Sequence, residues 1–544
     1  MAASVSQNGR FRAVFLSVIM VLMTQVGYTN NMDFSIGLDP ETESKDTGSS
    51  TPALIPSVEG ANLMVGDLMD EITFQYNASA ASGSGSGSSS SSAFAYANNK
   101  LATGHQHTCA ILDTSDLKCW GGNGRGQLGD GSNTHTWGNV PTTTIDLGTG
   151  RTAVAVSAGH QHTCAILDNG DLKCWGYDYY GQLGDGGSNT DTNAPSSTAI
   201  VLGTGRTAVA VSAGYDYTCA ILDTGDLKCW GDNTYGQLGD GSNTNTNAPS
   251  STAIDLGTGR TAVAISAGFA HTCAILDNGD LKCWGVDGVG QLGDGGSNTN
   301  TNAPSSTAID LGTNRTAVAV SVGYAHTCAI LDNGDLKCWG SNGDRQTGYS
   351  SQSNIQAPRT DAVNLGSGRT VVAVSAGSYH TCAILDNGSA KCWGKSTYGQ
   401  LGYPTGCNNG CYGFAVGPID LGTGRTAVAV DTSAGFSDDH TCAILDNGEA
   451  KCWGHNGYGK LGNTSSSPPQ MLPILVSGNN TWDSSTTASS GSGGGMTNVA
   501  GATCTVSPAL PTGLSINGST CTISGTPSVY ANNQTHTIYA NLSG

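Results

Sequence analysis

The chain has 544 residues, which is enough for several domains or for one large repeat architecture. Only 12% of the residues are charged and 79 are glycine, while Ser, Thr, Asn and Asp crowd between short apolar runs, a composition typical of turn-rich all-β proteins. The net charge of −19 argues against direct nucleic-acid binding and against adhesion to an anionic membrane, because both need a basic surface.

Residues 1–29 have the pattern of a secretory signal. Arg10 and Arg12 precede an apolar stretch from Ala13 to Tyr28 that is short for a membrane span. No clear small-residue cleavage site follows, so an uncleaved N-terminal anchor is the alternative, and it would be the only membrane contact. Either way we expect the rest of the chain to be secreted or held at the cell surface. The eighteen cysteines, which fall into local pairs, then indicate a disulfide framework.

The segment that follows the signal contains two short apolar runs. They are Asn62-Leu-Met-Val-Gly-Asp-Leu and Ile72-Thr-Phe-Gln-Tyr. These runs resemble the opening strands of the immunoglobulin-like modules of surface proteins, so we assign residues 30–80 to a partial module of this kind. The Gly/Ser-rich run at 81–93 has the composition of a flexible linker.

Residues 94–476 repeat one unit seven times. The clearest copy is Cys164-Ala-Ile-Leu-Asp-Asn-Gly-Asp-Leu-Lys-Cys174-Trp-Gly, and the first cysteines of successive copies lie 55, 55, 54, 55, 54 and 60 residues apart. Each copy predicts four short strands, which in the second repeat are Thr152–Ser157, Thr163–Leu167, Asp171–Trp175 and Thr198–Leu202. Seven four-stranded units of this length predict an all-β, seven-bladed β-propeller.

The middle two strands of each unit form a predicted hairpin across Asp-Asn-Gly, which suits a three-residue loop. This loop places Cys164 opposite Cys174 and Ile166 opposite Leu172. At such non-hydrogen-bonded pairs the Cα atoms lie about 4.5 Å apart, which a disulfide can bridge. A spacing of ten residues is too wide for the usual zinc pair. The predicted disulfides are Cys109–Cys119, Cys164–Cys174, Cys219–Cys229, Cys273–Cys283, Cys328–Cys338, Cys382–Cys392 and Cys442–Cys452, with Cys407–Cys411 in an insertion and Cys504–Cys521 near the C-terminus.

The ring must also close. Six copies of the Thr-Ala-Val-Ala-Val strand lie between seven hairpins, so the first hairpin lacks a preceding strand of this type. We expect the segment from about Phe94 to pair with the last blade, whose own final strand is predicted at Met471–Val476. Such a clasp would tie the two ends of the propeller together.

Three recurring motifs, Gly-x-x-His-Thr-Cys-Ala-Ile-Leu, Gly-Asp-Leu-Lys-Cys-Trp-Gly and Tyr-Gly-Gln-Leu-Gly, resemble the regulator of chromosome condensation repeat family over about 100–476. The resemblance implies a seven-bladed propeller. It does not imply one function, since the family includes an exchange factor, a light receptor and a secreted enzyme inhibitor. The export signal, the paired cysteines and the lack of a basic tail argue against exchange-factor activity here.

The C-terminal region begins with a second predicted linker at 477–498. Residues 499–544 then contain Cys504-Thr-Val-Ser-Pro and Cys521-Thr-Ile-Ser-Gly, and resemble another immunoglobulin-like module. The chain ends soon after Tyr539, as a truncated module would.

No catalytic motif is present, so we expect a chain that is not an enzyme and has no cofactor. The loop Asp185–Asp191 leaves calcium as an alternative, although it lacks the regular spacing of known calcium loops. One repeat position holds histidine six times, and we interpret it as structural rather than as a metal ring. Its residues are His107, His162, Tyr217, His271, His326, His380 and His440.

Aromatic residues vary between repeats at two loop positions that should share one rim of the propeller. We predict that this rim is a binding surface, because aromatic side chains on rigid loops are good contact anchors. The predicted function is an exported binding or adhesion module that recognises a protein or glycan; the alternatives are an architectural spacer and an exported enzyme. The candidate rim residues are His105, His160, Tyr177, Tyr180, Tyr215, Tyr235, Phe269, Tyr324, Tyr398 and Tyr458.

Overall fold

The computed structural model describes residues 100–477 except 297, 405–416, 436–438 and 465–468, together with residue 482 and seven strands of a second unit. The chain divides into Ser88–Ser490 and a unit made of Met1–Gly87 with Gly491–Gly544. Among the described residues the only helical element is a short 3₁₀ turn, η2 (Gly457–Gly459). No helix in this described part is long and apolar enough to cross a bilayer.

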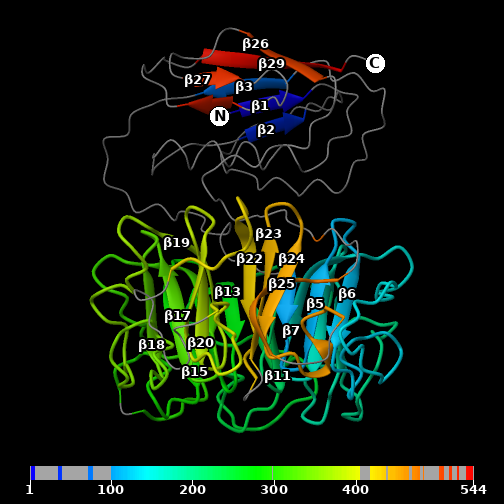
Figure 1. Cartoon of the computed structure of the whole chain (residues 1–544), viewed down its shortest axis with the longest axis vertical. Helices are drawn as coiled ribbons and strands as arrows, with labels where there is room; N and C mark the ends of the chain where they lie inside the picture. The colour runs from blue at the N-terminus through cyan, green and yellow to red at the C-terminus, as the bar shows by residue number, and fades with distance from the viewer. Residues whose placement is uncertain are drawn as a thin grey trace, which may run out of the picture. The chain divides into compact units, whose positions relative to one another are not determined.

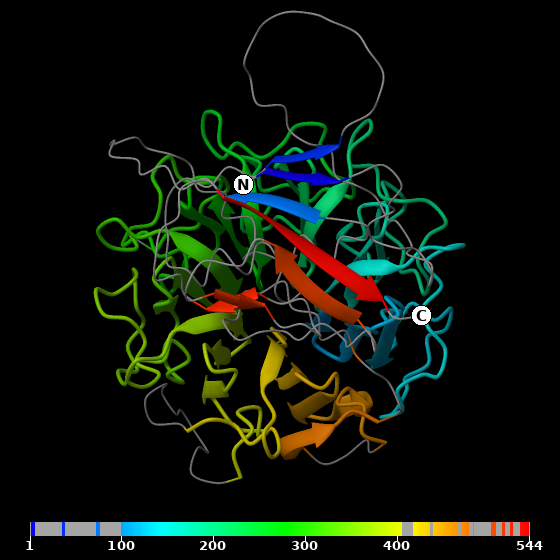
Figure 2. The same cartoon turned by 90° about the horizontal axis from the view of Figure 1, so that it is seen from above.

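Seven antiparallel sheets make up the unit Ser88–Ser490 (Figure 1) and surround a common axis when seen from above (Figure 2). The first strands of the sheets are β4 (Leu101–Thr103), β7 (Ala153–Ala158), β10 (Ala208–Ala213), β13 (Ala262–Ala267), β16 (Ala317–Val322), β19 (Val371–Ala376) and β22 (Ala427–Thr432). The second strands are β5 (His107–Ile111), β8 (His162–Leu167), β11 (Tyr217–Leu222), β14 (His271–Leu276), β17 (His326–Leu331), β20 (His380–Leu385) and β23 (His440–Leu445). The third strands are β6 (Leu117–Gly121), β9 (Leu172–Gly176), β12 (Leu227–Gly231), β15 (Leu281–Gly285), β18 (Leu336–Gly340), β21 (Ala390–Gly394) and β24 (Ala450–Gly454). This ring of sheets confirms the propeller.

The predicted fourth strand forms only in the last of the described sheets, as β25 (Gln470–Leu475), close to the predicted Met471–Val476. In the second blade, the segment Thr198–Leu202 is held to β9 by one backbone bond, from Ile200 N to Leu172 O at 2.9 Å. The carbonyl of Leu202 instead accepts a hydrogen bond of 2.8 Å from Lys228 Nζ of the next blade. The prediction of a full fourth strand in every blade is therefore wrong in detail: this segment makes one backbone bond to its own blade and one side-chain bond to the next.

The hairpin register agrees with the predicted one: Cys164 pairs with Cys174 and Ile166 with Leu172. Seven disulfides join the paired strands, with Cα–Cα distances of 4.0 to 4.1 Å. Each bridge thus lies within one hairpin and links no two blades. The predicted bridges Cys407–Cys411 and Cys504–Cys521 depend on residues outside the described part of the chain.

The ends of the propeller meet differently from the expectation. Strand β4 pairs with β5 of its own blade, so the predicted pairing of this segment with the last blade is wrong for the described residues from Lys100 onward. Trp482, which falls in the predicted linker 477–498, makes the junction instead. It forms a β-bridge with Leu112 of the first blade, and its backbone N–H donates to Gly448 O of the last blade at 2.9 Å. Its ring lies 5.3 Å from that of Trp120.

The core lies between neighbouring blades rather than within one sheet. Cys109, Ile111 and Leu117 of the first blade pack with Leu167 and Trp175 of the second. The indole N–H of Trp175 donates to Gln127 O of the preceding blade at 3.1 Å. Gly129, with φ of 74°, allows this approach, since a Cβ there would lie 2.5 Å from Trp175 Nε1. The repeated Gln-Leu-Gly motif therefore contacts the next blade's tryptophan, with the glutamine carbonyl as hydrogen-bond acceptor and the glycine packed against the indole.

The second unit contains a sheet in the order β2-β1-β3-β29-β26 and a separate two-stranded pair, β27 with β28. Strand β3 (Ile72–Tyr76) pairs antiparallel with β29 (Gln534–Leu542), so the N-terminal and C-terminal segments, which the sequence places in separate modules, share one sheet. The apolar stretch of the predicted signal lies outside the described residues. The remaining strands are β1 (Ala2–Val5), β2 (Ser35–Leu38), β26 (Ala502–Ser507), β27 (Leu514–Ile516) and β28 (Ile523–Gly525).

Candidate functional site

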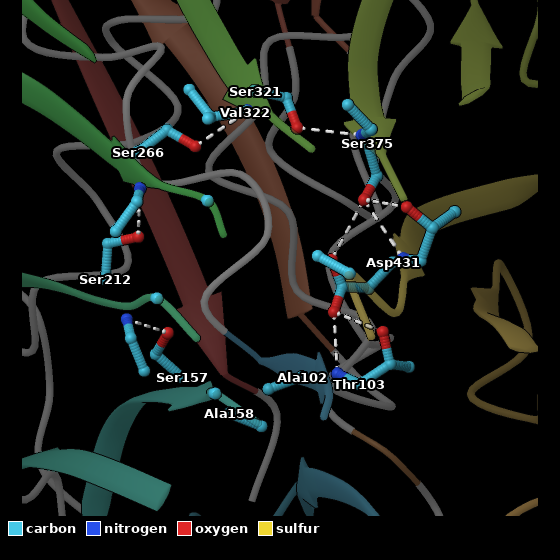
Figure 3. A pocket seen from close by; sticks show the side chains of 18 of the residues that line it. Ala102, Thr103, Ser157, Ala158, Ser212, Ser266, Ser321, Val322, Ser375 and Asp431 are labelled. Atoms are coloured by element: carbon cyan, nitrogen blue, oxygen red, sulfur yellow. Dashed lines mark hydrogen bonds between the residues drawn. The ribbon is translucent and has the colours of Figure 1, made fainter. Parts of the chain in front are cut away.

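The first strands of the blades line a central channel that contains a space of about 200 Å³. A serine follows the Val-Ala-Val or Val-Ala-Ile run of five of these strands, and its Oγ accepts a hydrogen bond of 2.9 to 3.0 Å from a backbone N–H of the next blade (Figure 3). Adjacent blades are thus joined around the channel. The five serines are Ser157, Ser212, Ser266, Ser321 and Ser375.

Asp431 takes the serine's place in the last blade and joins it to the first. Its Oδ2 accepts hydrogen bonds from Thr103 N at 2.7 Å and from Thr103 Oγ1 at 2.9 Å, and its Oδ1 accepts one from Ser375 Oγ at 3.0 Å. Burial raises the pKa of Asp431 to about 6, although these hydrogen bonds oppose the increase. In the first blade the equivalent residue is Ala102, which has no side-chain acceptor.

A second ring of hydrogen bonds surrounds the first and uses the recurring histidines. The Nε2 of each histidine lies 2.7 to 2.9 Å from a threonine Oγ1 of the next blade, as in His107 with Thr163 and His440 with Thr108. Tyr217 replaces histidine once, and its hydroxyl lies 2.9 Å from Thr272 Oγ1. All seven junctions between blades, including the one that closes the ring, have this contact.

The histidines of this ring act as hydrogen-bond donors through Nε2. Each threonine hydroxyl donates to a backbone carbonyl, as Thr163 does to Gln127 O at 2.8 Å, so the imidazole Nε2–H must be the donor. Burial lowers the pKa of His107 and His162 to about 3, and neighbouring histidines lower it further. These side chains therefore join neighbouring blades through Nε2, while their Nδ1 atoms are buried and have no hydrogen-bond partner among the described residues.

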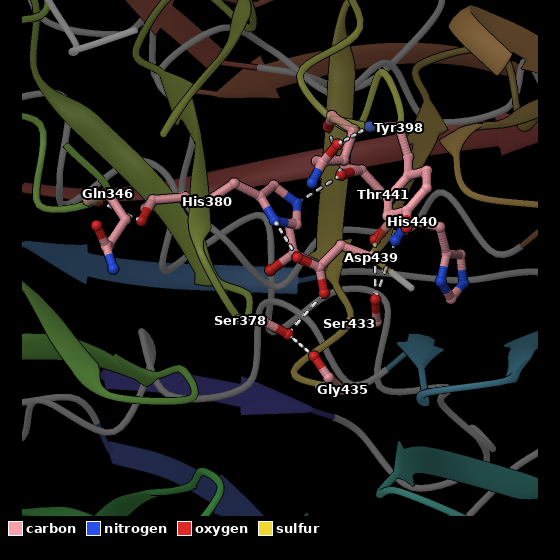
Figure 4. Close-up of polar contacts among 12 residues, drawn as sticks. Gln346, Ser378, His380, Tyr398, Ser433, Gly435, Asp439, His440 and Thr441 are labelled. Atoms are coloured by element: carbon pink, nitrogen blue, oxygen red, sulfur yellow. Dashed lines mark hydrogen bonds and ion pairs between the residues drawn. The ribbon is translucent and has the colours of Figure 1, made fainter. Parts of the chain in front are cut away.

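Ser378, His380 and Asp439 form a buried cluster at the junction of the last two blades (Figure 4). Ser378 Oγ contacts Gly435 O and lies 2.6 Å from Asp439 Oδ1, while His380 Nδ1 lies 3.7 Å from Asp439 Oδ2. The serine hydroxyl therefore bonds to the carboxylate and not to the imidazole. With all three side chains at most 1% exposed, the cluster lacks the accessible, base-activated hydroxyl that a nucleophile needs.

Six aromatic rings form a continuous arc at the mouth of the channel, which we call the aromatic arc. Successive ring centroids lie 5.0, 3.9, 4.8, 4.4 and 5.7 Å apart. These are distances at which aromatic pairs attract one another. All six residues are partly buried, and both ring nitrogens of His105 are buried. In order around the ring they are His105, His160, Tyr215, Phe269, Tyr324 and Tyr379.

The structure thus brings together five of the ten predicted rim residues. It adds Tyr379, which the alignment of the repeats misses because it lies one position later in its turn than the other members. The arc has acidic neighbours: His160 Nδ1 lies 3.5 Å from Asp216 Oδ1. Burial, followed by the charge of Asp216, raises the pKa of Tyr215 to about 12.

The other predicted rim residues lie in outlying groups on the loops that follow the third strands. Tyr177 and Tyr180 cluster with Tyr179, which is 66% exposed and is not among the ten candidate rim residues. Arg125 stacks over the Tyr177 ring at 4.8 Å. Elsewhere Tyr398 contacts His455, Tyr458 contacts His135, and Tyr235 is 42% exposed. These loops lie at the same end of the blades as the aromatic arc. The loops begin where the third strand ends, and this end pairs with the start of the second strand, which the arc residues directly precede.

Family models match most of this chain. A model described as RCC1-like domain matches residues 149–500, and models of the regulator of chromosome condensation (RCC1) repeat match 99–127 and 119–166. A model described as putative Ig domain matches residues 464–544.

Curated relatives share the repeat but differ in length. The chain is 30% identical over 300 residues to the ultraviolet-B receptor UVR8 of Arabidopsis thaliana. The alignment covers 55% of this chain and 65% of the receptor. It is 28% identical over 361 residues to the human E3 ubiquitin-protein ligase HERC2, and this alignment covers 66% of this chain and 7% of the ligase. The chain therefore spans less than two thirds of either relative.

Solved structures with the same fold include yeast RCC1 (Prp20) bound to Kap60, with a TM-score of 0.58, 17% identity and coverage of 74% of this chain and 90% of that chain. Human WBSCR16 gives a TM-score of 0.52 at 20% identity, covering 63% and 85%. At such identities the likeness concerns the fold alone. The match of the RCC1-like model to more than half of the sequence, on a ring of seven sheets, shows that the chain belongs to the RCC1-like domain family.

Proposed function

We propose that this chain is an exported, non-catalytic binding module that recognises a protein at the cell exterior through the face that carries the aromatic arc. The observation on which the proposal rests is the arc itself: six half-buried rings in mutual contact around the channel mouth.

The arc is well suited to binding because it is held in place before a partner arrives. Each ring sits in the turn directly before the second strand, whose first residue takes part in the inter-blade hydrogen-bond ring. Aromatic side chains lose little conformational entropy on binding and bury a large area, which is why they dominate interface energetics. A rigid base reduces the ordering cost further. The outlying tyrosines at the same end of the propeller would extend the contact surface.

A protein is the partner class that the relatives favour. Yeast RCC1 (Prp20) binds Kap60 in its crystal structure, and Prp20p of Saccharomyces cerevisiae is described as binding Gsp1p and histones. An exported location is supported by the signal-like pattern of residues 1–29 and by a disulfide in each of seven hairpins, since disulfides persist in oxidising compartments.

The binding face is tested with the full chain, produced by secretion and immobilised, and proteins from the producing cells' medium and surface fraction. A triple variant, Tyr215→Ala, Phe269→Ala and Tyr324→Ala, should reduce capture of a specific protein at least about tenfold, as expected when interface hot spots are removed. The matched control carries Asn169→Ala, Asn278→Ala and Asn333→Ala in hairpin loops at the opposite end of the blades and should bind normally.

The outcomes separate the alternatives. Capture that survives in the arc variant would reject this face as the binding surface. A specific bound glycan in place of a protein would replace the partner class, and no specific partner for the wild type would favour an architectural spacer. The export part is tested independently, by comparing the amount of full chain and of a chain lacking residues 1–29 in the medium and at the cell surface.

A further inference from the structure

One fully buried position in the long loops of the blades differs in chemistry from blade to blade. It holds Asn123 in the first blade and Asn233 in the third, but Asp178 in the second and Asp287 in the fourth. In all four blades the side-chain Oδ1 accepts the N–H of a leucine five residues later, at 2.9 to 3.0 Å. The side chains are therefore anchored in the same orientation.

The asparagine blades show what the other half of this side chain faces. Asn123 Nδ2 donates to Asp130 Oδ1 at 3.1 Å and to Ser132 O at 3.0 Å. Asn233 Nδ2 donates to Asp240 Oδ1 at 3.2 Å and to Ser242 O at 3.1 Å. The loop thus forms a cage of oxygen acceptors that surrounds one donor.

In the aspartate blades an acceptor occupies the donor's place. Because Oδ1 of Asp178 is used by Leu183 N, its Oδ2 lies where the amide nitrogen lies in the other blades. Asp178 Oδ2 and Asp287 Oδ2 are buried and have no hydrogen-bond partner among the described residues. Asp185 stands where Asp130 and Asp240 stand and likewise caps its own loop, accepting Gly187 N–H at 2.7 Å. An acceptor without a partner thus replaces the amide donor in this part of the cage.

The loops change in length together with this residue. Between the cage carboxylate and the next Ser-Asn-Thr, the asparagine blades have one glycine, after Asp130 and Asp240. The aspartate blades have two glycines, after Asp185 and Asp294. Two independent blades thus combine a buried carboxylate with a longer loop, as a cage that encloses an additional group would require.

We propose that Asp178 and Asp287 each bind a calcium ion, together with Asp185 or Asp294 and carbonyl oxygens of the same loop. Calcium takes six to eight oxygen ligands in flexible geometry, and it accepts carboxylates, carbonyls and water together. Asp185 and Asp294 are exposed, so ions and water reach the cage. Burial raises the pKa of Asp178 to about 7 and that of Asp287 to about 6, and Asp185 and Asp294 add to the respective shifts. A bound cation would relieve this cost.

The ligand set predicts modest affinity. In the described part of the chain no group of three acidic, histidine or cysteine side chains is placed to hold a metal, so each site relies on two carboxylates. Asp191 is occupied elsewhere, since its Oδ1 lies 3.2 Å from Asp178 N and its Oδ2 lies 3.1 Å from Arg125 Nη1. We expect dissociation constants on the order of 10⁻⁴ to 10⁻³ M, the range of extracellular calcium modules.

The test is calorimetric titration of the metal-free full chain with CaCl₂ at pH 8, with melting measured in CaCl₂ and in chelator. The wild type should bind two ions and melt at a higher temperature in calcium. Asp178→Asn and Asp287→Asn should each remove one ion, and together both. These variants should fold, because asparagine is the residue that the first and third blades use. Asp240→Asn, in a loop that already holds asparagine, should still bind two.

Three results would overturn the proposal. The first is the absence of calcium binding by the wild type at pH 8. If acid also stabilised the wild type but not the double variant, the cage would hold a proton in place of a metal ion. The second is unchanged calcium binding by the double variant. The third is an equal response to MgCl₂, which would reject a calcium-selective cage.

Discussion

His162 illustrates how single side chains hold the blades together. It is fully buried, and its Nε2 lies 2.9 Å from Thr218 Oγ1 of the next blade. The chain itself offers a substitute, because Tyr217 makes the same contact one blade later with its hydroxyl. The Tyr217 hydroxyl, however, donates its proton to His271 O at 2.7 Å. The position therefore requires a ring with a polar atom at its far end, and not an imidazole as such. This explains why the histidines could be interpreted as structural from their repetition alone.

The substitution series at His162 follows from this contact. His162→Ala should lower the free energy of unfolding by about 2–5 kcal/mol, because it leaves a cavity and an unfilled inter-blade contact. His162→Tyr should cost less than the alanine variant, about 1–3 kcal/mol, because it restores the inter-blade contact but enlarges a fully buried side chain. Denaturant unfolding of the two variants measures the difference, and equal losses would contradict the role assigned to the ring.

The low pKa of buried histidines such as His162 also makes the free energy of unfolding depend on pH in acid. The pKa of His162 falls from 6.5 to about 3 on folding, so the unfolded chain takes up a proton first as the pH drops. Stability that is present above pH 6.5 is therefore lost as the pH falls towards about 3, by about 1.4 kcal/mol per pH unit for each such histidine. In His162→Tyr the slope of unfolding free energy against pH should decrease by one proton in this interval. An unchanged slope would show that this histidine does not contribute.

At the scale of elements, the hairpins were predictable and the outermost segments were not. The hairpin register follows from local rules: an Asp-Asn-Gly loop, alternating apolar residues and a cysteine pair on one face. The segment Thr198–Leu202 is also bonded by Lys228, which belongs to another blade, so no local pattern reveals this contact. The same division holds for the candidate site. Five arc residues share a repeat position, whereas Tyr379 is displaced by one residue and escapes a positional search.

The lysine that holds the outermost segment gives a prediction for this scale. Lys228 is 7% exposed and donates to Leu202 O at 2.8 Å. Lys228→Met should destabilise the protein by about 1–3 kcal/mol, because it leaves a buried carbonyl without its donor. Arg206→Met removes a half-exposed ion pair with Asp223 and should cost less than about 1 kcal/mol. Hydrogen exchange at Ile200 should accelerate in the first variant only; the reverse order would refute the assignment.

The whole ring depends on contacts that no repeat unit contains. Trp482 lies in a region whose composition predicted a linker, and nothing in the seven-fold pattern indicates that it returns to the first blade. Asp431 replaces serine at the end of the last Val-Ala-Val run, yet its partner Thr103 lies more than 300 residues away in sequence. Closure was therefore the part of the fold that periodicity could not supply, since periodicity describes only what the blades have in common.

Trp482→Ala should consequently weaken the ring where it closes. The loss of a buried indole costs about 3–5 kcal/mol, and here it also removes the ring that packs on Trp120. We expect a lower melting temperature and faster hydrogen exchange in β4 and β5 than in β16 and β17, which are on other blades. Uniform acceleration across all blades would argue against a local closure role.

The confinement of each sulfur bridge to its own hairpin bears on how such a protein is made. Its two cysteines are ten residues apart in sequence, so they emerge from the ribosome almost together, and would also leave an export channel together if the proposed export holds. Correct oxidation can then precede the synthesis of the next unit, and the many wrong pairings open to the cysteines of these seven hairpins are avoided without a search. Blades can be completed one at a time in chain order, whereas the ring can close only after Trp482 has been synthesised.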